Sequence, residues 1–268
     1  MKNNKIFSLL AIFLLFAMVS CSEKEDQDTP PDLPPVDALM MDFSEFIDNP
    51  ANQSALKSMN TYQNALYSYA TVAIWNIVAT APMIIPVAAY LESFKHTPVY
   101  LGENSWQWSY SVNAGMDTYT ARLVTKRISN EEFKADMFIT RVGVYEDFKW
   151  FEGTVRYDRT HAEWTMYESA LNNVKWLNIE WNKDWELDVS DITYTIVKAG
   201  GPENGSFIEF GIVDDETYDA YYSISYSQKE TFIEWNLSSK VGRVKDMVTF
   251  GDADWHCWNE VFLDVDCN

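Results

Sequence analysis

The feature that most constrains this chain is the stretch from Ser58 to Leu91, which contains no charged side chain. A run of about 18 or more apolar residues is a candidate membrane span. Pro82 and Pro86 lie inside this one, and each proline removes a backbone donor and crowds the preceding turn. The sequence therefore predicts two shorter helices, separated near Ala81, that are buried in the core of the protein.

The first of these helices has a recognisable start and a regular spacing. Asn49 is a suitable cap, and Pro50 fits the first helical turn. Apolar residues then recur at helical spacing: Leu56, Met59, Leu66, Ala70, Ala73 and Ile77. The second half is apolar on all sides, which predicts that other elements surround it. With a short amphipathic helix expected over 37–48, residues 37–96 form a helical segment.

From Thr97 onward the apolar period changes from about four residues to two. Alternating runs such as 106–112, 133–139, 177–181 and 208–212 are separated by turn signals, among them Gly200-Gly201-Pro202 and Asn204-Gly205. Short strands without helices between them are typical of an antiparallel meander. We therefore expect an α+β fold in which the N-terminal helices pack against a large antiparallel β segment over 97–268. A strongly curved sheet, an open barrel or a sandwich fits this pattern, with residues 37–268 as one domain.

The N-terminal residues have the organisation of an export signal. Lys2 and Lys5 precede an apolar run over 6–19, which ends at Met18-Val19-Ser20-Cys21. This ending resembles the lipobox of bacterial lipoproteins, which implies that residues 1–20 are a signal peptide and that Cys21 becomes acylated. The alternative is an ordinary secretory signal with an incidental cysteine.

The residues that follow Cys21 bear on the location of the protein. Residues 22–28 (SEKEDQD) are similar to the export tag of Bacteroidota lipoproteins, which implies a lipid-anchored protein of the outer membrane that faces the cell surface. A periplasm-facing anchor is the alternative. Residues 29–36 (TPPDLPPV) are rich in proline and favour an extended conformation. Residues 21–36 are therefore interpreted as an acidic, proline-rich tether.

The charge of the chain limits its partners. Its 40 acidic residues exceed its 20 basic ones, for a formal net charge of −20. Such a surface repels phosphate groups, which argues against a nucleic-acid partner. Attachment to the membrane is therefore expected through the N-terminal lipid.

Two cysteines remain after Cys21, namely Cys257 and Cys267. An even pair in an exported chain is a candidate disulfide. Its formation requires a turn between the two residues, because the Cα atoms of a disulfide lie within about 7 Å. Two free thiols are the alternative.

The sequence offers little evidence of catalysis. The three histidines, His96, His161 and His256, are scattered and have no zinc-ligand spacing. No nucleophile elbow, phosphate loop or dinucleotide motif is present in the sequence. We therefore expect a protein that is not an enzyme and that uses neither a cofactor nor a metal. The abundant carboxylates leave a two-carboxylate glycosidase as an alternative.

Some aromatic residues lie in polar surroundings, where they are available to stack on a ligand. They are Trp181, Trp185, Tyr218, Tyr221, Trp255 and Trp258. These residues predict a non-catalytic binding role, with an amphiphile or a glycan as the ligand. The alternative is a structural or accessory subunit of an outer-membrane protein assembly, in which the aromatic surface contacts a protein partner.

The lipid-anchor hypothesis makes a direct prediction about Cys21. Substitution Cys21→Ala removes the acylation site, so the protein is expected to leave the membrane fraction, as measured by immunoblotting after carbonate washing. A variant that stays with the membranes would refute the anchor and make 70–91 a candidate span again.

Overall fold

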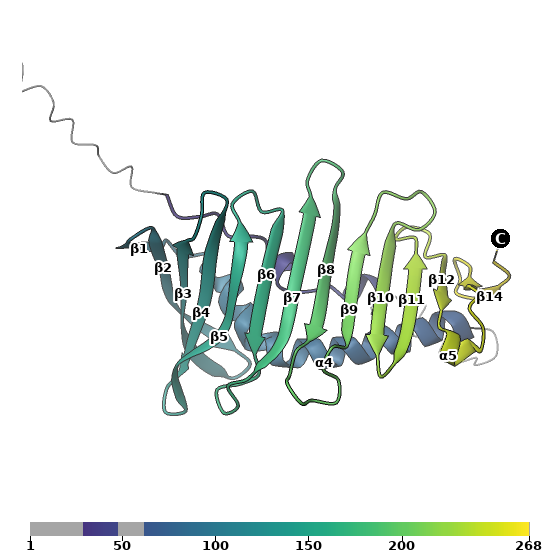
Figure 1. Cartoon of the computed structure of the whole chain (residues 1–268), viewed down its shortest axis with the longest axis horizontal. Helices are drawn as coiled ribbons and strands as arrows, with labels where there is room; N and C mark the ends of the chain where they lie inside the picture. The colour runs from purple at the N-terminus through teal and green to yellow at the C-terminus, as the bar shows by residue number, and fades with distance from the viewer. Residues whose placement is uncertain (1–28, 48–61, 268) are drawn as a thin grey trace, which may run out of the picture. The chain divides into compact units, whose positions relative to one another are not determined.

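The computed structural model describes residues 29–47 and 62–267. Residues from Pro31 to the C-terminus form one compact unit, in which the described strands make a single antiparallel sheet of 14 members (Figure 1). The predicted signal peptide, Cys21, the acidic residues 22–28 and the expected helix start at Asn49 and Pro50 lie outside the described residues.

The strands are β1 (Val99–Gly102), β2 (Ser105–Ala114), β3 (Asp117–Arg127), β4 (Glu132–Arg141), β5 (Tyr145–Arg156), β6 (His161–Tyr167), β7 (Lys175–Asp184), β8 (Val189–Ile196), β9 (Phe207–Ile212), β10 (Ala220–Tyr226), β11 (Lys229–Trp235), β12 (Gly242–Lys245), β13 (His256–Trp258) and β14 (Asp264–Val265). The helical elements are η1 (Val36–Ala38), α2 (Ser44–Ile47), α4 (Gln63–Ser93) and α5 (Met247–Phe250).

Each strand pairs with its neighbours in the sequence, from β1 at one edge to β14 at the other, so the predicted meander is confirmed. The sheet is open, because β1 and β14 do not pair with each other within the described residues. With one long helix among those residues, the fold is rich in β structure, and its helical part is smaller than the α+β prediction implied.

The sheet has an apolar inner face and a polar outer face, as the period of two requires. On β4, Phe133, Ala135, Met137 and Ile139 are all fully buried. The residues between them point to the other side, where Lys134 contributes to the polar outer face. The core of the protein therefore lies on the inner face, which must be covered by other parts of the chain.

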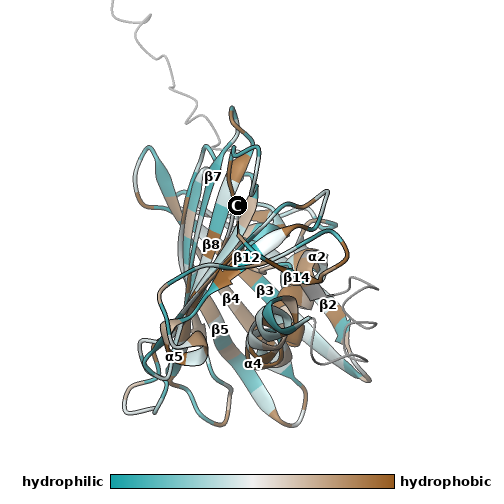
Figure 2. Ribbon diagram, turned by 90° about the vertical axis from the view of Figure 1, so that its right-hand side faces the viewer, coloured by the Kyte–Doolittle hydropathy of each residue, from teal (hydrophilic) through white to brown (hydrophobic). Residues whose placement is uncertain are grey.

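Helix α4 provides most of that cover, running across the strands on the inner face (Figures 1 and 2). The predicted break near Ala81 is wrong, because α4 is continuous through Pro82 and Pro86. The reason is tertiary packing, which outweighs the backbone bonds that the two prolines remove. A buried line of side chains extends past both prolines: Val72, Trp75, Ala79, Met83, Val87 and Tyr90.

The opposite side of α4 is bare, so the prediction that its apolar second half is surrounded is also wrong. Ile77 is 71% exposed and Ile84 is 59% exposed. Among the described residues α4 is the one helix long and apolar enough to cross a membrane, and 39% of its most apolar window is buried. One side of this uniformly apolar helix therefore packs on the sheet, and its other side is left uncovered.

Polar contacts hold both ends of α4 against opposite ends of the sheet. The carboxylate of Asp264 accepts hydrogen bonds from the backbone N–H groups of Gln63 and Asn64, each 3.0 Å long. It thereby serves as the N-terminal cap that Tyr62, the residue before the helix, does not supply. At the other end, the Tyr110 hydroxyl donates to the carbonyl of Ala89 at 2.6 Å.

Residues 31–47 form a second layer on the inner face. The predicted amphipathic helix over 37–48 is replaced by the short η1 and α2, joined by an extended segment. Side chains of the sheet donate hydrogen bonds to the backbone carbonyls of this layer. The Trp164 indole donates to the Ala38 carbonyl at 2.7 Å, and the Tyr194 hydroxyl donates to the Leu39 carbonyl at 3.0 Å. Part of the expected tether belongs to this layer too, because Pro34 is buried.

Three strand glycines make room for large aromatic side chains. Gly153, Gly211 and Gly242 lie directly opposite Trp164, Tyr221 and Trp258, respectively. A Cβ atom at any of the three would overlap the partner's ring. Each pair therefore fills the space above a glycine with an aromatic ring from the next strand.

This packing predicts a specific loss of stability for Gly153→Val. The new side chain would overlap both the Trp164 indole and the backbone carbonyl of Glu163, and the carbonyl cannot rotate away. We expect a loss of about 2 to 4 kcal/mol in the free energy of unfolding, measured by urea denaturation. Thr154→Val on the adjacent, outward-facing position is the control, with an expected change below about 0.5 kcal/mol. Equal stability of the two variants would contradict the packing argument.

Candidate ligand-binding site

A pocket of about 340 Å³ opens where residues 37–42 cross the inner face of β7, β8 and β9. It is lined by Asp37, Met40, Asp42, Trp181, Ser190, Asp191, Ile192, Phe210, Ile212 and Leu237. We call it the inner pocket. Its volume is near the lower end of the range for small-molecule sites.

The floor of the inner pocket is aromatic and aliphatic because three strands place it there. Trp181, Ile192 and Phe210 are paired across β7, β8 and β9, and so form one row on the inner face. Trp181 and Ile192 are 3% and 4% exposed, respectively. Leu237 borders the floor, and its backbone N–H is held by the Asp219 carboxylate at 2.7 Å. The floor can therefore accept an apolar group without exposing it to water.

The rim of the inner pocket is acidic. Asp37 and Asp42 flank the chain segment that crosses the sheet, and both are exposed. Asp191 also borders the pocket, but it follows the alternate row of β8, so its carboxylate lies on the outer face, where it accepts a hydrogen bond from the Asn182 amide at 2.8 Å. No Lys, Arg or His lines the pocket. The arrangement places an apolar floor below two negative charges, which favours a positively charged group over an anion.

The six aromatic residues predicted as ligand contacts do not gather at one place. Trp181 is part of the inner-pocket floor. Tyr218 and Trp255 lie on either side of Arg243, whose guanidinium carbon is 4.4 and 4.3 Å from their ring centres. Arg243 also pairs with Glu234, so this second group is already occupied by an internal cation.

The remaining three aromatic residues have structural contacts. Trp185 is 51% exposed in the turn after β7, and its indole donates to the Arg159 carbonyl at 3.2 Å. Tyr221 covers Gly211, and its hydroxyl donates to Glu209. Trp258 is 1% exposed, and its indole donates to the Lys240 carbonyl at 2.8 Å.

The structure joins Cys257 and Cys267 by a disulfide, with an S–S distance of 2.09 Å and a Cα–Cα distance of 5.3 Å. The Asn64 side-chain amide donates to the Cys257 carbonyl at 2.9 Å. Asp264, which caps α4, lies between the two cysteines in the sequence. The disulfide therefore fastens the segment that holds the start of α4.

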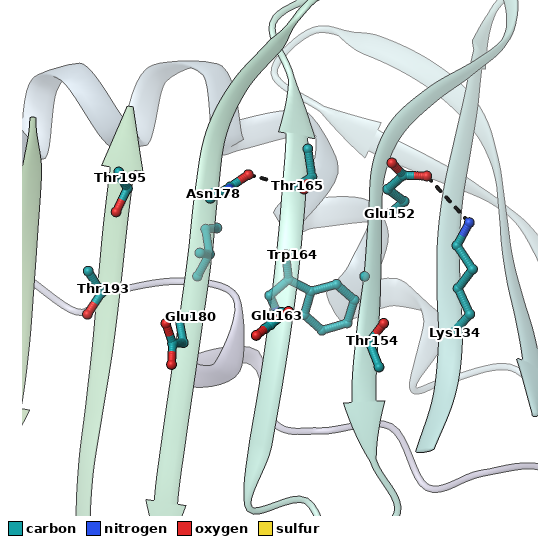
Figure 3. A pocket seen from close by; sticks show the side chains of 12 residues that line it. Lys134, Glu152, Thr154, Glu163, Trp164, Thr165, Asn178, Glu180, Thr193 and Thr195 are labelled. Carbon is teal, nitrogen blue, oxygen red and sulfur yellow. Dashed lines mark hydrogen bonds and ion pairs between the residues drawn. The ribbon is translucent and has the colours of Figure 1, made fainter. Parts of the chain in front are cut away.

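A second hollow, of about 500 Å³, lies on the outer face and is polar. The close-up in Figure 3 shows its threonine, asparagine and glutamate side chains on β5 to β8, with Lys134 on β4 at one side. Trp164 contributes only from beneath, because its ring packs on the inner side under Gly153. The outer hollow therefore offers hydrogen-bonding groups without an exposed aromatic platform.

One carboxylate of the outer hollow is fixed in its charged form. Burial alone would raise the pKa of Glu152, but hydrogen bonds from Lys149 and Tyr167 and the charges of Lys149 and Lys134 lower it to about 2. The Lys149 and Tyr167 contacts are each 3.0 Å long. A glycosidase needs a general acid with a raised pKa, so Glu152 is unsuited to that role.

None of the three histidines lines the inner pocket or the outer hollow. His96 stacks on Tyr110, with ring centres 4.9 Å apart, and His161 contacts Asn182 at 2.7 Å. His256 stacks on Phe250 at 3.9 Å. Within the described ranges, no three His, Cys, Asp or Glu side chains are grouped to hold a metal ion.

Comparisons with known proteins give no family. No protein-family model matches the chain, and neither a curated protein nor a solved structure matches it. The inner pocket is therefore interpreted from its own geometry.

Most inner-pocket residues could not be selected from the sequence. Asp37 and Asp42 occur in the run DALMMD, where they read as the polar side of a short helix. Phe210 and Leu237 read as ordinary core residues on separate strands. The available signal was Trp181, an aromatic residue next to the polar segment Asn182-Lys183-Asp184.

The Glu152 network predicts a dependence of stability on pH. The folded-state pKa of Glu152 lies below its ordinary 4.5, so its stabilisation is present above about pH 4.5 and disappears as the pH falls toward 2. Glu152→Gln is expected to lower the unfolding free energy by about 1 kcal/mol at pH 7. The difference from the parent protein should shrink at pH 3 and vanish near pH 2, measured by urea denaturation.

The matched control for that series is Glu146→Gln, which changes an exposed carboxylate on the same strand. It should alter stability by less than about 0.5 kcal/mol at each pH. A Glu152→Gln effect that stays constant from pH 7 to 2 would refute the role of the ionised carboxylate.

Proposed function

We propose that this chain is a lipid-anchored, non-catalytic lipoprotein of the outer membrane, facing the cell surface, that binds a cationic amphiphile in the inner pocket. The observation that carries the proposal is the combination of an aromatic floor with an acidic rim. Trp181 and Phe210 supply the floor, and Asp37 and Asp42 supply the charge. An alkylammonium ligand satisfies both parts at once.

The other ligand class considered, a glycan, has less support. Sugar rings stack on exposed aromatic faces, and the outer hollow, which has the polar groups for a sugar, has its only aromatic residue underneath the sheet. Tyr218 and Trp255, both half-buried, come closest to a platform, but Arg243 contacts both of their rings. A glycan would therefore have to displace an internal cation.

The second candidate function, an accessory subunit of an outer-membrane protein assembly, is favoured by a different observation. The bare side of α4 exposes large apolar residues, including Ile74 and Ile84 at 53% and 59%. Contiguous apolar surface beyond a few hundred Å² marks an interaction site in proteins generally. This side of α4 is distinct from the inner pocket, which no residue of α4 lines.

Titration with hexyltrimethylammonium tests the proposed ligand class. We expect saturable binding by calorimetry and a change in tryptophan emission, because the ligand would contact Trp181. The double variant Asp37→Asn/Asp42→Asn should bind about tenfold more weakly, since two rim charges are removed. The double variant Asp254→Asn/Asp266→Asn removes two exposed carboxylates outside the pocket and should bind like the parent.

Neutral hexyl glucoside separates the alternatives in the same assay. The acidic rim gives it no ionic contact, so its binding should be at least tenfold weaker than that of the ammonium compound. Equal or tighter binding of the glucoside, or rim variants that bind the ammonium compound normally, would refute the proposed ligand class.

A further inference from the structure

The uncovered side of α4 forms a continuous apolar surface that the proposed ligand site does not use. Its large exposed residues follow helical spacing along α4 and end at Phe94, the residue after the helix. We call this surface the bare stripe; it consists of Ile74, Ile77, Val78, Ile84, Leu91 and Phe94. It extends about 30 Å from Ile74 to Phe94, at about 1.5 Å per residue.

The bare stripe is neutral in a strongly acidic protein. The chain has a formal net charge of −20, yet no charged residue occurs from Ser58 to Leu91. The nearest carboxylate is Glu92, which is paired with Lys95 at 2.8 Å and contacts His96 at 3.3 Å. The exposed side of α4 is therefore itself uncharged up to Leu91.

The length of the chain before the compact unit limits how far that unit can lie from an anchor at Cys21. The compact unit begins at Pro31, ten positions after Cys21. A chain of that length can span at most about 35 Å.

We propose that the bare stripe docks on the surface of the lipid bilayer to which the protein is anchored. The proposal rests on the proposed acylation of Cys21, whose short connection would keep the compact unit within about 35 Å of the lipid. Aliphatic side chains with Phe94 at one end suit the boundary between head groups and acyl chains. The lipid would be uncharged, because the acidic protein is repelled by anionic head groups.

A second copy of the chain is the main competing occupant. The six residues of the bare stripe expose roughly 600 Å² per copy, which is below the roughly 800 Å² per partner of a standard interface. Two copies would also bring together bodies that each have a net charge of −20. A bilayer brings no such repulsion if its lipids are neutral.

Vesicle flotation tests the proposal with a chain that begins at Ser22 and so retains the whole compact unit but lacks the acylation site. We expect it to float with phosphatidylcholine vesicles and to float less with vesicles that contain phosphatidylglycerol. The variant Ile77→Asp/Ile84→Asp should partition at least tenfold less. Val142→Asp/Leu171→Asp changes two residues that are 84% and 95% exposed elsewhere and should partition like the parent.

A site-specific probe guards against a variant that merely unfolds. In the chain from Ser22, Cys257 and Cys267 form the disulfide, so Ile77→Cys introduces the one free thiol for an environment-sensitive dye. Its emission should shift to the blue with phosphatidylcholine vesicles, whereas a dye at Leu171→Cys should not shift.

Three outcomes would overturn the proposal: no flotation of the parent, flotation unaffected by Ile77→Asp/Ile84→Asp, or a dye at position 77 that does not respond. A dimer in sedimentation that these aspartates dissociate would assign the stripe to a second copy instead. Because this chain lacks Cys21, such failures are distinct from a failure of the lipid anchor or of ligand binding in the inner pocket.

Discussion

The structure depends on the contact between α4 and the inner face of the sheet. An open antiparallel sheet this long has one apolar face, and that face must be covered for the fold to be stable. α4 crosses the strands and is held near both edges, by Asp264 on β14 and by Tyr110 on β2. Residues 31–47 fill the space that the helix leaves, through contacts with Trp164 and Tyr194.

The same constraint explains why the two proposed surfaces lie where they do. The inner pocket occurs where residues 37–42 cross β7 to β9, so its floor is core-like and its rim is polar. The bare stripe occurs because α4 is apolar on every side while the sheet covers only one of them. Both surfaces arise from the way the inner face is covered, and the outer face contributes a network of charged groups around Glu152.

Several predictions were wrong or incomplete for reasons of tertiary contact. Pro82 and Pro86 normally interrupt a helix, but α4 continues because Ala79, Met83 and Val87 pack against the protein on both sides of them. Residues 37–48 have helical spacing, but the indole of Trp164 satisfies the Ala38 carbonyl in place of a helical bond. The six selected aromatic residues were separated because cross-strand register, which places Tyr221 over Gly211 and Trp258 over Gly242, is not visible in a single sequence.

The sequence alone determined the antiparallel meander, because strict alternation fixes which side chains face the core on each strand. It also determined the charge of the surface and the neutral stretch up to Leu91. Tertiary structure decided that the sheet is single and open, that α4 is continuous and half bare, and that Asp37, Asp42 and Trp181 share a pocket. The physical reason is that periodicity reports only local environment, whereas caps, cross-strand partners and pockets join residues that are distant in the chain.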